Sequence, residues 1–257
     1  MKQRQVIIDR SRCVGCGLCS RVCVAHNIAV SGQKAGTIGD ACIFCGQCLA
    51  VCPQKAISMA GCGDGQVEKK GDVRLCPDAV LDVIRFRRSI RTFQQRAVPR
   101  EVLEQVLEAG RLTHTAKNAQ DLSFVVLDRE RDRVEGMALK LFRAVRPIVG
   151  RFSPLARNSR IDDHFFFFRA PIAIAVLAEN RTNGVLAAQN MEFVAEANGL
   201  GVLYSGFFTM AARASRKIKQ AIGVPKGKQV AMTLVLGYPG VKFLRSTPHR
   251  ELDARYL

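Results

Sequence analysis

The sequence predicts an α+β protein in which a small cysteine-rich module precedes a larger domain of mixed helices and strands. Two observations carry this prediction. All ten cysteines of the 257 residues lie between Cys13 and Cys76, and the rest of the chain, positions 77–257, contains none. From about residue 79 onward, helical and strand-like hydrophobic patterns alternate. We expect the module over residues 1–60, a linker over residues 61–78 and the larger domain over residues 79–257.

The expected module contains the same cysteine pattern twice. Each copy has the spacing C-x2-C-x2-C-x3-C, and all four cysteines of the second copy follow those of the first at one constant offset. A duplication of this kind predicts a small pseudo-symmetric module. Short strands are expected at its two ends, over residues 6–9 and 56–59. The two sets of cysteines are Cys13, Cys16, Cys19 and Cys23, and Cys42, Cys45, Cys48 and Cys52.

Four cysteines at such close spacing suit a metal site, because thiolates are soft ligands that favour iron-sulfur clusters or zinc. The double pattern resembles that of bacterial-type two-cluster ferredoxins over residues 1 to about 60. The resemblance implies two 4Fe-4S clusters with crossed ligation, in which the fourth cysteine of each copy serves the other cluster. The implied ligand sets are Cys13, Cys16, Cys19 and Cys52 for one cluster, and Cys42, Cys45, Cys48 and Cys23 for the other.

Some features of the module depart from this pattern or leave alternatives open. A pair of zinc sites is one alternative, although zinc fingers usually place two ligands close together and two far apart. Proline follows Cys52, but valine follows Cys23, where the ferredoxins commonly have a second proline. Cys62 and Cys76 are surplus, and two thiols cannot build a third cluster. We therefore expect these two to be free or packed cysteines.

Hydrophobic periodicity predicts the elements of the larger domain in order. A helix is expected over residues 79–87, and Pro99 stands at the start of the next one. The strands expected over residues 171–177 and 230–236 are predicted as buried because their apolar runs are continuous. Gly199 ends the longest helix. The remaining helices are expected over residues 129–145, 182–198 and 211–222, and the strands over residues 122–127, 171–177 and 230–236.

Three polar strings in this domain carry candidate chemistry. Arg87, Arg88 and Ser89 suit a phosphate, because guanidinium groups give bidentate bonds and serine gives a short donor. Asn118 and Gln120 offer both donors and acceptors, which suits a heterocycle with an N–C=O edge. A Gly-Tyr-Pro string near the end of the domain is followed by Lys and Arg. Each string alone also fits a plain role as a basic helix end, a polar strand start or a strand exit.

Taken together and in order, these strings resemble the nitroreductase family of FMN enzymes over residues 79–257. RRSIRTF is similar to the opening motif of the family, TAKNAQ to its S-x-x-N-x-Q segment, and FFFFRAP to its F-x-x-A-P segment. NGLG is similar to its G-L-G turn, and GYPGVKFLR to its closing segment. The resemblance implies a central mixed sheet flanked by helices. It also implies an intertwined homodimer, with one FMN at each end of the interface.

The resemblance also implies roles for individual residues. His114-Thr115 and Asp121-Leu122 replace the family's usual Pro-Ser and Pro-Trp, which puts the substrate side in question more than the FMN side. His114 could donate a proton near the flavin or be a plain surface histidine. The pocket wall is expected around Arg160 and the run Phe165 to Phe168. The implied FMN residues are Arg87, Arg88, Ser89, Lys242 and Arg245 for the phosphate and ribityl chain, Arg91 as a further candidate, Thr115, Asn118 and Gln120 toward the ribityl and ring, and the backbone of Ser205 and Gly206 at the other ring edge.

The sequence thus predicts a flavin-dependent oxidoreductase. Electrons from an external low-potential donor such as reduced ferredoxin would pass through two 4Fe-4S clusters to FMN and reduce a small organic acceptor, such as a nitroaromatic, a quinone or an activated alkene. Other reduced-flavin chemistry, including reductive dehalogenation or flavin fragmentation, and a non-enzymatic relay to a partner protein remain alternatives. No G-x-G-x-x-G string supports a dedicated nicotinamide domain, and the sequence leaves NAD(P)H as a donor open.

Charge and hydropathy limit the classes of partner that the sequence allows. The net charge is +17, of which +4 falls in residues 1–78 and +13 in residues 79–257. A nucleic-acid partner is disfavoured because aromatic residues are only 7% and are not interleaved with the basic ones. The longest apolar run, residues 170–178, is too short for a membrane span. With no secretory leader visible, we expect a cytoplasmic protein with reduced thiols rather than a disulfide framework.

Overall fold

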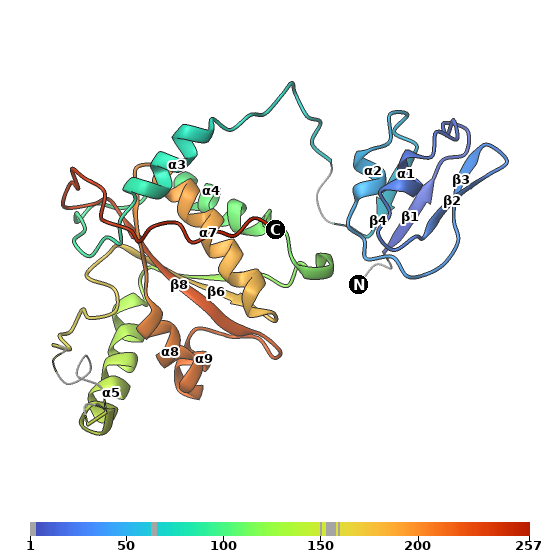
Figure 1. The fold of residues 1–257 in the computed structure, drawn as a ribbon. Helices are drawn as coiled ribbons and strands as arrows, with labels where there is room; N and C mark the ends of the chain where they lie inside the picture. Colours follow the sequence, from blue (N-terminus) through green and yellow to red (C-terminus); the bar gives the residue numbers. More distant parts are fainter. Residues whose placement is uncertain (1–3, 63–65, 150, 153–157, 159) are drawn as a thin grey trace. The chain divides into compact units, whose positions relative to one another are not determined.

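The computed structural model of the protein describes residues 4–62, 66–149, 151–152, 158 and 160–257 (Figure 1). The chain divides into two compact units. The first comprises Met1–Val73 with Thr115–Ala119, and the second Arg74–His114 with Gln120–Leu257. Helices and strands occur in both, which confirms the predicted α+β class. Residues 63–65 of the expected linker lie outside the described residues.

The described part of residues 1–73 in the first unit is built from two strand pairs and two short helices. Strands β1 (Gln5–Ile8) and β4 (Ile57–Ala60) pair antiparallel, close to where the sequence predicts them. Strands β2 (Ile28–Ser31) and β3 (Lys34–Thr37) form a hairpin that the sequence analysis missed. Its turn places both Gly32 and Gln33 at positive φ, 57° and 60°. Such a two-residue turn matches the twist of the paired strands.

The cysteine duplication is repeated in the backbone. Helices α1 (Leu18–Arg21) and α2 (Gln47–Ala50) each follow a glycine, Gly17 and Gly46, at φ 75°. Glycine adopts this left-handed conformation without steric cost. The two turns therefore have the same geometry at equivalent positions of the two copies, as the pseudo-symmetric module requires.

The second unit is organised around a four-stranded sheet with the order β5-β6-β8-β7. All three pairings between neighbouring strands are antiparallel. A parallel bridge joins Ser89 to Val202 of β7, so the predicted mixed character arises at this edge. The strands are β5 (Ser123–Leu127), β6 (Ile172–Ala178), β7 (Gly201–Tyr204) and β8 (Gln229–Gly237).

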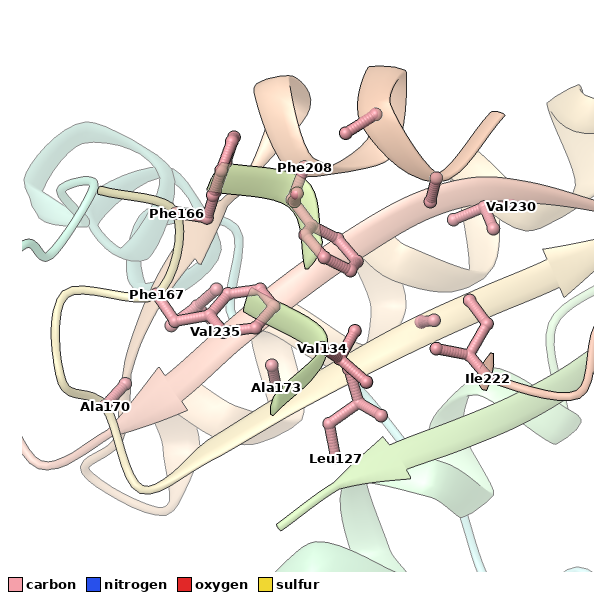
Figure 2. Close-up of a cluster of buried hydrophobic side chains, with 14 of the residues drawn as sticks. Leu127, Val134, Phe166, Phe167, Ala170, Ala173, Phe208, Ile222, Val230 and Val235 are labelled. Carbon is pink, nitrogen blue, oxygen red and sulfur yellow. The ribbon is translucent and has the colours of Figure 1, made fainter. Parts of the chain in front are cut away.

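Both faces of this sheet are covered. Successive residues of β6, such as Ile174 and Ala175, point to opposite faces and belong to two different hydrophobic clusters. This explains why β6 reads as a continuous apolar run rather than an alternating one. Figure 2 shows one cluster, in which Phe167, Phe208 and Val134 pack over β6 and β8. The other cluster lies under helices α4 (Arg100–Arg111) and α7 (Arg181–Ala197).

Two expectations for this unit are corrected. The single helix predicted over residues 211–222 is two helices, because Ser215 adopts an extended conformation and its side chain caps the second. Phe166 and Phe167 are fully buried in the core, so they do not form the wall of an open pocket. The remaining helices of this unit are α3 (Pro77–Phe86), α5 (Arg131–Val149), α8 (Gly206–Ala214) and α9 (Arg216–Ala221). The short 3-10 helix η1 (Ala116–Asn118) groups with the first unit. Among the described residues, no helix has the length and apolar character needed to cross a membrane.

Candidate functional site

Two cavities in the first unit are lined by cysteines. In each, three cysteines of one copy of the motif meet the last cysteine of the other copy. These groupings are the crossed sets that the ferredoxin resemblance implies. Cys62 and Cys76 are both exposed and contribute to neither cavity. The two sets are Cys13, Cys16, Cys19 and Cys52, and Cys42, Cys45, Cys48 and Cys23.

Backbone amides donate to the cysteine sulfurs in a repeated arrangement. The amides of Asn27 and Ala56 each lie 3.3 Å from the sulfur four residues earlier, in Cys23 and Cys52. These are the two cysteines that cross between the motifs. An N–H bond to sulfur stabilises thiolate charge and raises the reduction potential of a cluster bound to it.

The acidity of the thiols follows their surroundings. The backbone N–H groups of Ala35 and Gly15 lower the pKa of Cys13 below its ordinary value. Burial raises the pKa of Cys19 and Cys48. Four soft sulfur donors around one cavity fit an iron-sulfur cluster, since metal binding takes such thiols as thiolates.

The second unit has an open pocket of about 460 Å³ with a cationic lining. Arg87 and Arg88, which follow α3, meet Lys242 of the C-terminal segment there. Three of the predicted phosphate residues are therefore brought together. Gln94 and Gly240 complete part of the wall. A pocket with this charge can bind a phosphate through charge-assisted hydrogen bonds.

The other residues predicted around the phosphate do not line this pocket. Ser89 is bridged to Val202 in the sheet, and Arg91 and Arg245 are exposed elsewhere on the unit. Arg88 also donates to the Thr247 hydroxyl at 2.7 Å, which ties the C-terminal segment to the pocket.

A buried acid stands beside Arg87 that the sequence analysis did not identify. Glu192 of α7 has a side chain only 1% exposed and lies 3.3 Å from the Arg87 guanidinium. Its Oε2 accepts hydrogen bonds from Gln189 Nε2 at 2.8 Å and from the Tyr204 hydroxyl at 3.2 Å. The available signal was an acid within the apolar stripe of α7, next to Met191. Charged side chains are seldom fully buried unless they are paired.

Glu196 lies one turn further along α7 and lines the same pocket. Burial raises its pKa to about 7, and the negative charge of Glu192 adds to the shift. Burial also raises the pKa of Tyr204, again with help from Glu192. The pocket thus combines three fixed cations with one acid that titrates near neutrality.

The segment predicted to approach the flavin ring is divided between the two units. Thr115 and Asn118 group with the first unit, where Asn118 Nδ2 donates to the carbonyls of Phe44 at 2.8 Å and Ile43 at 3.3 Å. Gln120 belongs to the second unit. Lys117, Asn118 and Gln120 all have positive φ, between 48° and 53°. Strained non-glycine backbone of this kind concentrates at functional sites.

Ser205 and the motif departures have structural roles in the second unit. Ser205 is buried, its hydroxyl donates to the Phe166 carbonyl at 2.9 Å, and Gly206 begins α8. Asp121 accepts from the Asn180 amide and from Asn183 Nδ2, both at 2.8 Å. Burial alone would raise the pKa of Asp121, but these hydrogen bonds outweigh it and the pKa is lowered. His114 is exposed.

Comparisons with known proteins agree with this architecture. The model of the "Nitroreductase family" matches residues 84–238, and that of a "4Fe-4S dicluster domain" matches residues 5–65. A protein of Methanothermobacter thermautotrophicus, provisionally named an NADH dehydrogenase/NAD(P)H nitroreductase, is 25% identical over 185 residues, which cover 68% of this chain and 81% of that protein.

Solved structures give the same fold. A nitroreductase with bound FMN from Desulfitobacterium hafniense is 18% identical with a TM-score of 0.58, and covers 68% of this chain and 97% of its own. A nitroreductase with bound FMN from Bacteroides fragilis is 19% identical with a TM-score of 0.58, and covers 69% and 98%. Because the nitroreductase model spans more than half of the 257 residues, the chain belongs to the nitroreductase family of flavin-dependent oxidoreductases and carries a 4Fe-4S dicluster domain ahead of it.

Proposed function

We propose that this protein takes single electrons through two 4Fe-4S clusters to FMN and uses them to reduce a small organic acceptor. The observation that supports this most is the pairing, in one chain, of two four-cysteine cavities with a cationic pocket. The dicluster module would hold one cluster in each cavity, with the crossed ligation described above. The nitroreductase domain would hold the FMN phosphate in the pocket of Arg87, Arg88 and Lys242.

FMN, when bound, supplies both one- and two-electron chemistry, so it can collect single electrons and deliver them in pairs. The residues of the chain would bind FMN and orient it. The two arginines and Lys242 hold the phosphate by charge, and the Asn118 and Gln120 side chains are proposed to reach the ribityl and ring edges. The backbone of Ser205 and Gly206 is proposed to face the other edge of the ring. As in the family resemblance, we propose a homodimer with one FMN at each end of its interface.

The electron donor is proposed to be an acidic, low-potential protein such as reduced ferredoxin. The +13 charge of residues 79–257 supports this, because complementary charge steers association and raises its rate. Joining clusters and flavin in one chain turns electron delivery into an intramolecular step with a high effective concentration. The thiols would stay reduced in the cytoplasm, where we place the protein.

The test begins with anaerobic purification of the full chain. We expect about eight iron atoms and about one FMN per chain, with broad iron-sulfur absorbance at roughly 400 nm. The protein, reduced by ferredoxin, should be reoxidised rapidly by nitroaromatics, quinones or activated alkenes. Oxidation only by a partner protein would favour the relay instead. Flavin without any iron, in protein whose cysteines are intact, would overturn the proposal.

A further inference from the structure

Two acids on α7 lie against the cationic pocket and take no part in the proposed electron path. Glu192 and Glu196 are one helical turn apart, so their side chains share a face. Glu192 is buried behind the pocket, whereas Glu196 lines it. Two carboxylates this close to a phosphate site oppose the binding of an anion unless their charge is neutralised.

Glu192 has its charge neutralised by an internal partner. Its Oε2 is held by Gln189 and Tyr204, while its buried Oε1 accepts no hydrogen bond from any described group. That oxygen instead faces the Arg87 guanidinium at 3.3 Å. Because a guanidinium has five N–H donors in a planar fork, Arg87 can remain on Glu192 and still present donors to the pocket.

Glu196 lacks such a close pairing among the described residues, and its surroundings decide its charge. On its own helix it faces Glu192, and Arg87 is the cation that acts on it. Arg88 and Lys242 share the pocket wall with it.

The other elements packed against α7 add little charge. Strand β7 contributes Tyr204, and β6 and β8 contain no charged residue. Helix α4 presents the uncharged Gln105, which accepts from Asn198. Of the three acids of α4, Glu104 pairs with Arg100 and Glu108 with Arg111, and Glu101 is exposed.

We propose that the pair Glu192 and Glu196 makes phosphate binding in this pocket proton-coupled: Glu196 takes up one proton from solvent as the phosphate dianion enters, while Glu192 positions Arg87. The inference rests on the proposed function, in which the phosphate is that of FMN. The physical reason is that an entering dianion raises the cost of the Glu196 carboxylate charge. Protonation removes that cost, so ligand and proton bind together.

The direction in which the FMN affinity changes with pH follows from the titration of Glu196 in the flavin-free protein. Burial and Glu192 already raise the pKa of Glu196 to about 7, and a bound phosphate raises it further. Well below about pH 7, Glu196 is neutral with or without ligand, so it adds no pH dependence to the affinity. As the pH rises above about 7, binding requires proton uptake and the affinity falls. The phosphate itself titrates near a pH of about 6, so above about pH 7 it is mostly the dianion.

The experiment measures the Kd of FMN for the full chain, stripped of flavin, between about pH 6.5 and 9 by quenching of flavin fluorescence. For the wild type we expect the Kd to rise roughly threefold to tenfold above about pH 7, since one unit of pKa difference is tenfold in affinity. Glu196→Gln should bind FMN tightly with a flat profile. Glu101→Gln, an exposed acid on α4, should behave as the wild type. Riboflavin, which lacks the phosphate, should show no such rise in Kd.

A second variant isolates the positioning role. Glu192→Gln should weaken FMN binding at every pH, because Arg87 loses its anchoring charge, and it should lower the pH at which the Kd begins to rise. The proposal is overturned if Glu196→Gln keeps the wild-type profile or if riboflavin shows the same dependence. Failure of FMN to bind at any pH would instead overturn the proposed function together with this inference.

Discussion

The two units hold themselves together by different means. In the first, the buried cluster among the described residues has seven members, and three of them are cysteines, Cys13, Cys19 and Cys48. In the second, clusters of twenty and twelve buried residues cover the two faces of one sheet. Small modules rarely bury enough apolar surface to be stable without a metal or other cross-link. Loss of a ligand should therefore damage the first unit alone, and a packing defect should damage the second alone.

Replacing a predicted cluster ligand should give the largest effect. Cys16→Ala removes a thiolate that lines one cavity, so we expect loss of one cluster and a fall in ferredoxin-driven turnover of more than about 100-fold, with FMN content unchanged. Iron analysis, visible absorbance and turnover measure this. Cys62→Ala is the matched control, because Cys62 is exposed and outside both cavities. Full iron content in Cys16→Ala would contradict the ligand assignment.

A defect in packing should have the opposite result, with the second unit destabilised and the clusters of the first retained. In Gly184→Ala, the new Cβ would stand 2.2 Å from Ala231 Cβ and 3.3 Å from Ala178 Cβ, and neither neighbour has a side chain that can rotate away. We expect the second unit to lose about 3 kcal/mol of stability, at the upper end for overpacking, while the iron content stays the same.

Gly136→Ala provides the control for that substitution. It lies within helix α5, where a Cβ would meet nothing within 4 Å. It should therefore stabilise the helix by about 0.5 to 1 kcal/mol. Thermal unfolding followed together with iron release compares the two variants. Equal melting temperatures for both would show that α7 and β8 do not pack as described.

A substitution in the pocket should affect flavin alone. Arg87→Ala should weaken FMN binding by about 1 to 3 kcal/mol, the scale of a lost charge-assisted bond, and leave the clusters in place. Dilution followed by fluorescence of the released flavin measures the loss. Arg85→Ala is the control, since Arg85 pairs with Asp82 on an exposed surface. Full flavin retention by Arg87→Ala would remove this residue from the phosphate site.

The smallest effect concerns stability as a function of pH. The folded-state pKa of Glu196 is raised to about 7, above its unfolded value of about 4.3. The favourable contribution of its neutral form is therefore complete below about pH 4.3 and is lost as the pH rises through about 7. Discounted for partial exposure, Glu196→Gln should be more stable than the wild type by about 1 kcal/mol at pH values above about 8. The difference should vanish near pH 4, as denaturant unfolding at both pH values would test.

Local pattern predicted most of the elements, and the misses have local reasons. Strand β6 was predicted because seven apolar residues in a row need cover on both faces, and α4 because Pro99 marks its start. The break at Ser215 was missed because the flanking residues favour helix on both sides. The β2–β3 hairpin was missed because its turn depends on Gln33 at positive φ, which a non-glycine residue rarely adopts.

The candidate site was predictable where function depends on spacing. The duplicated cysteine motif led to the same crossed groups of cysteines that line the two cavities. Arg87, Arg88 and Lys242 were named from their motifs, and the fold brings them to one pocket. Glu192 could not be found in this way. Its role depends on contacts with Arg87, which lies far earlier in the chain, and with Tyr204 in a neighbouring strand.

From the sequence alone we could therefore predict the two-part organisation, the sets of metal-type cysteines and the basic residues of the pocket. Each of these features depends on residue type and short-range spacing. The folded structure was needed to show which charges neutralise one another and which acid is left to titrate. Burial and the distance between charges set those properties, and both arise when α7, β7 and the segment after α3 pack together.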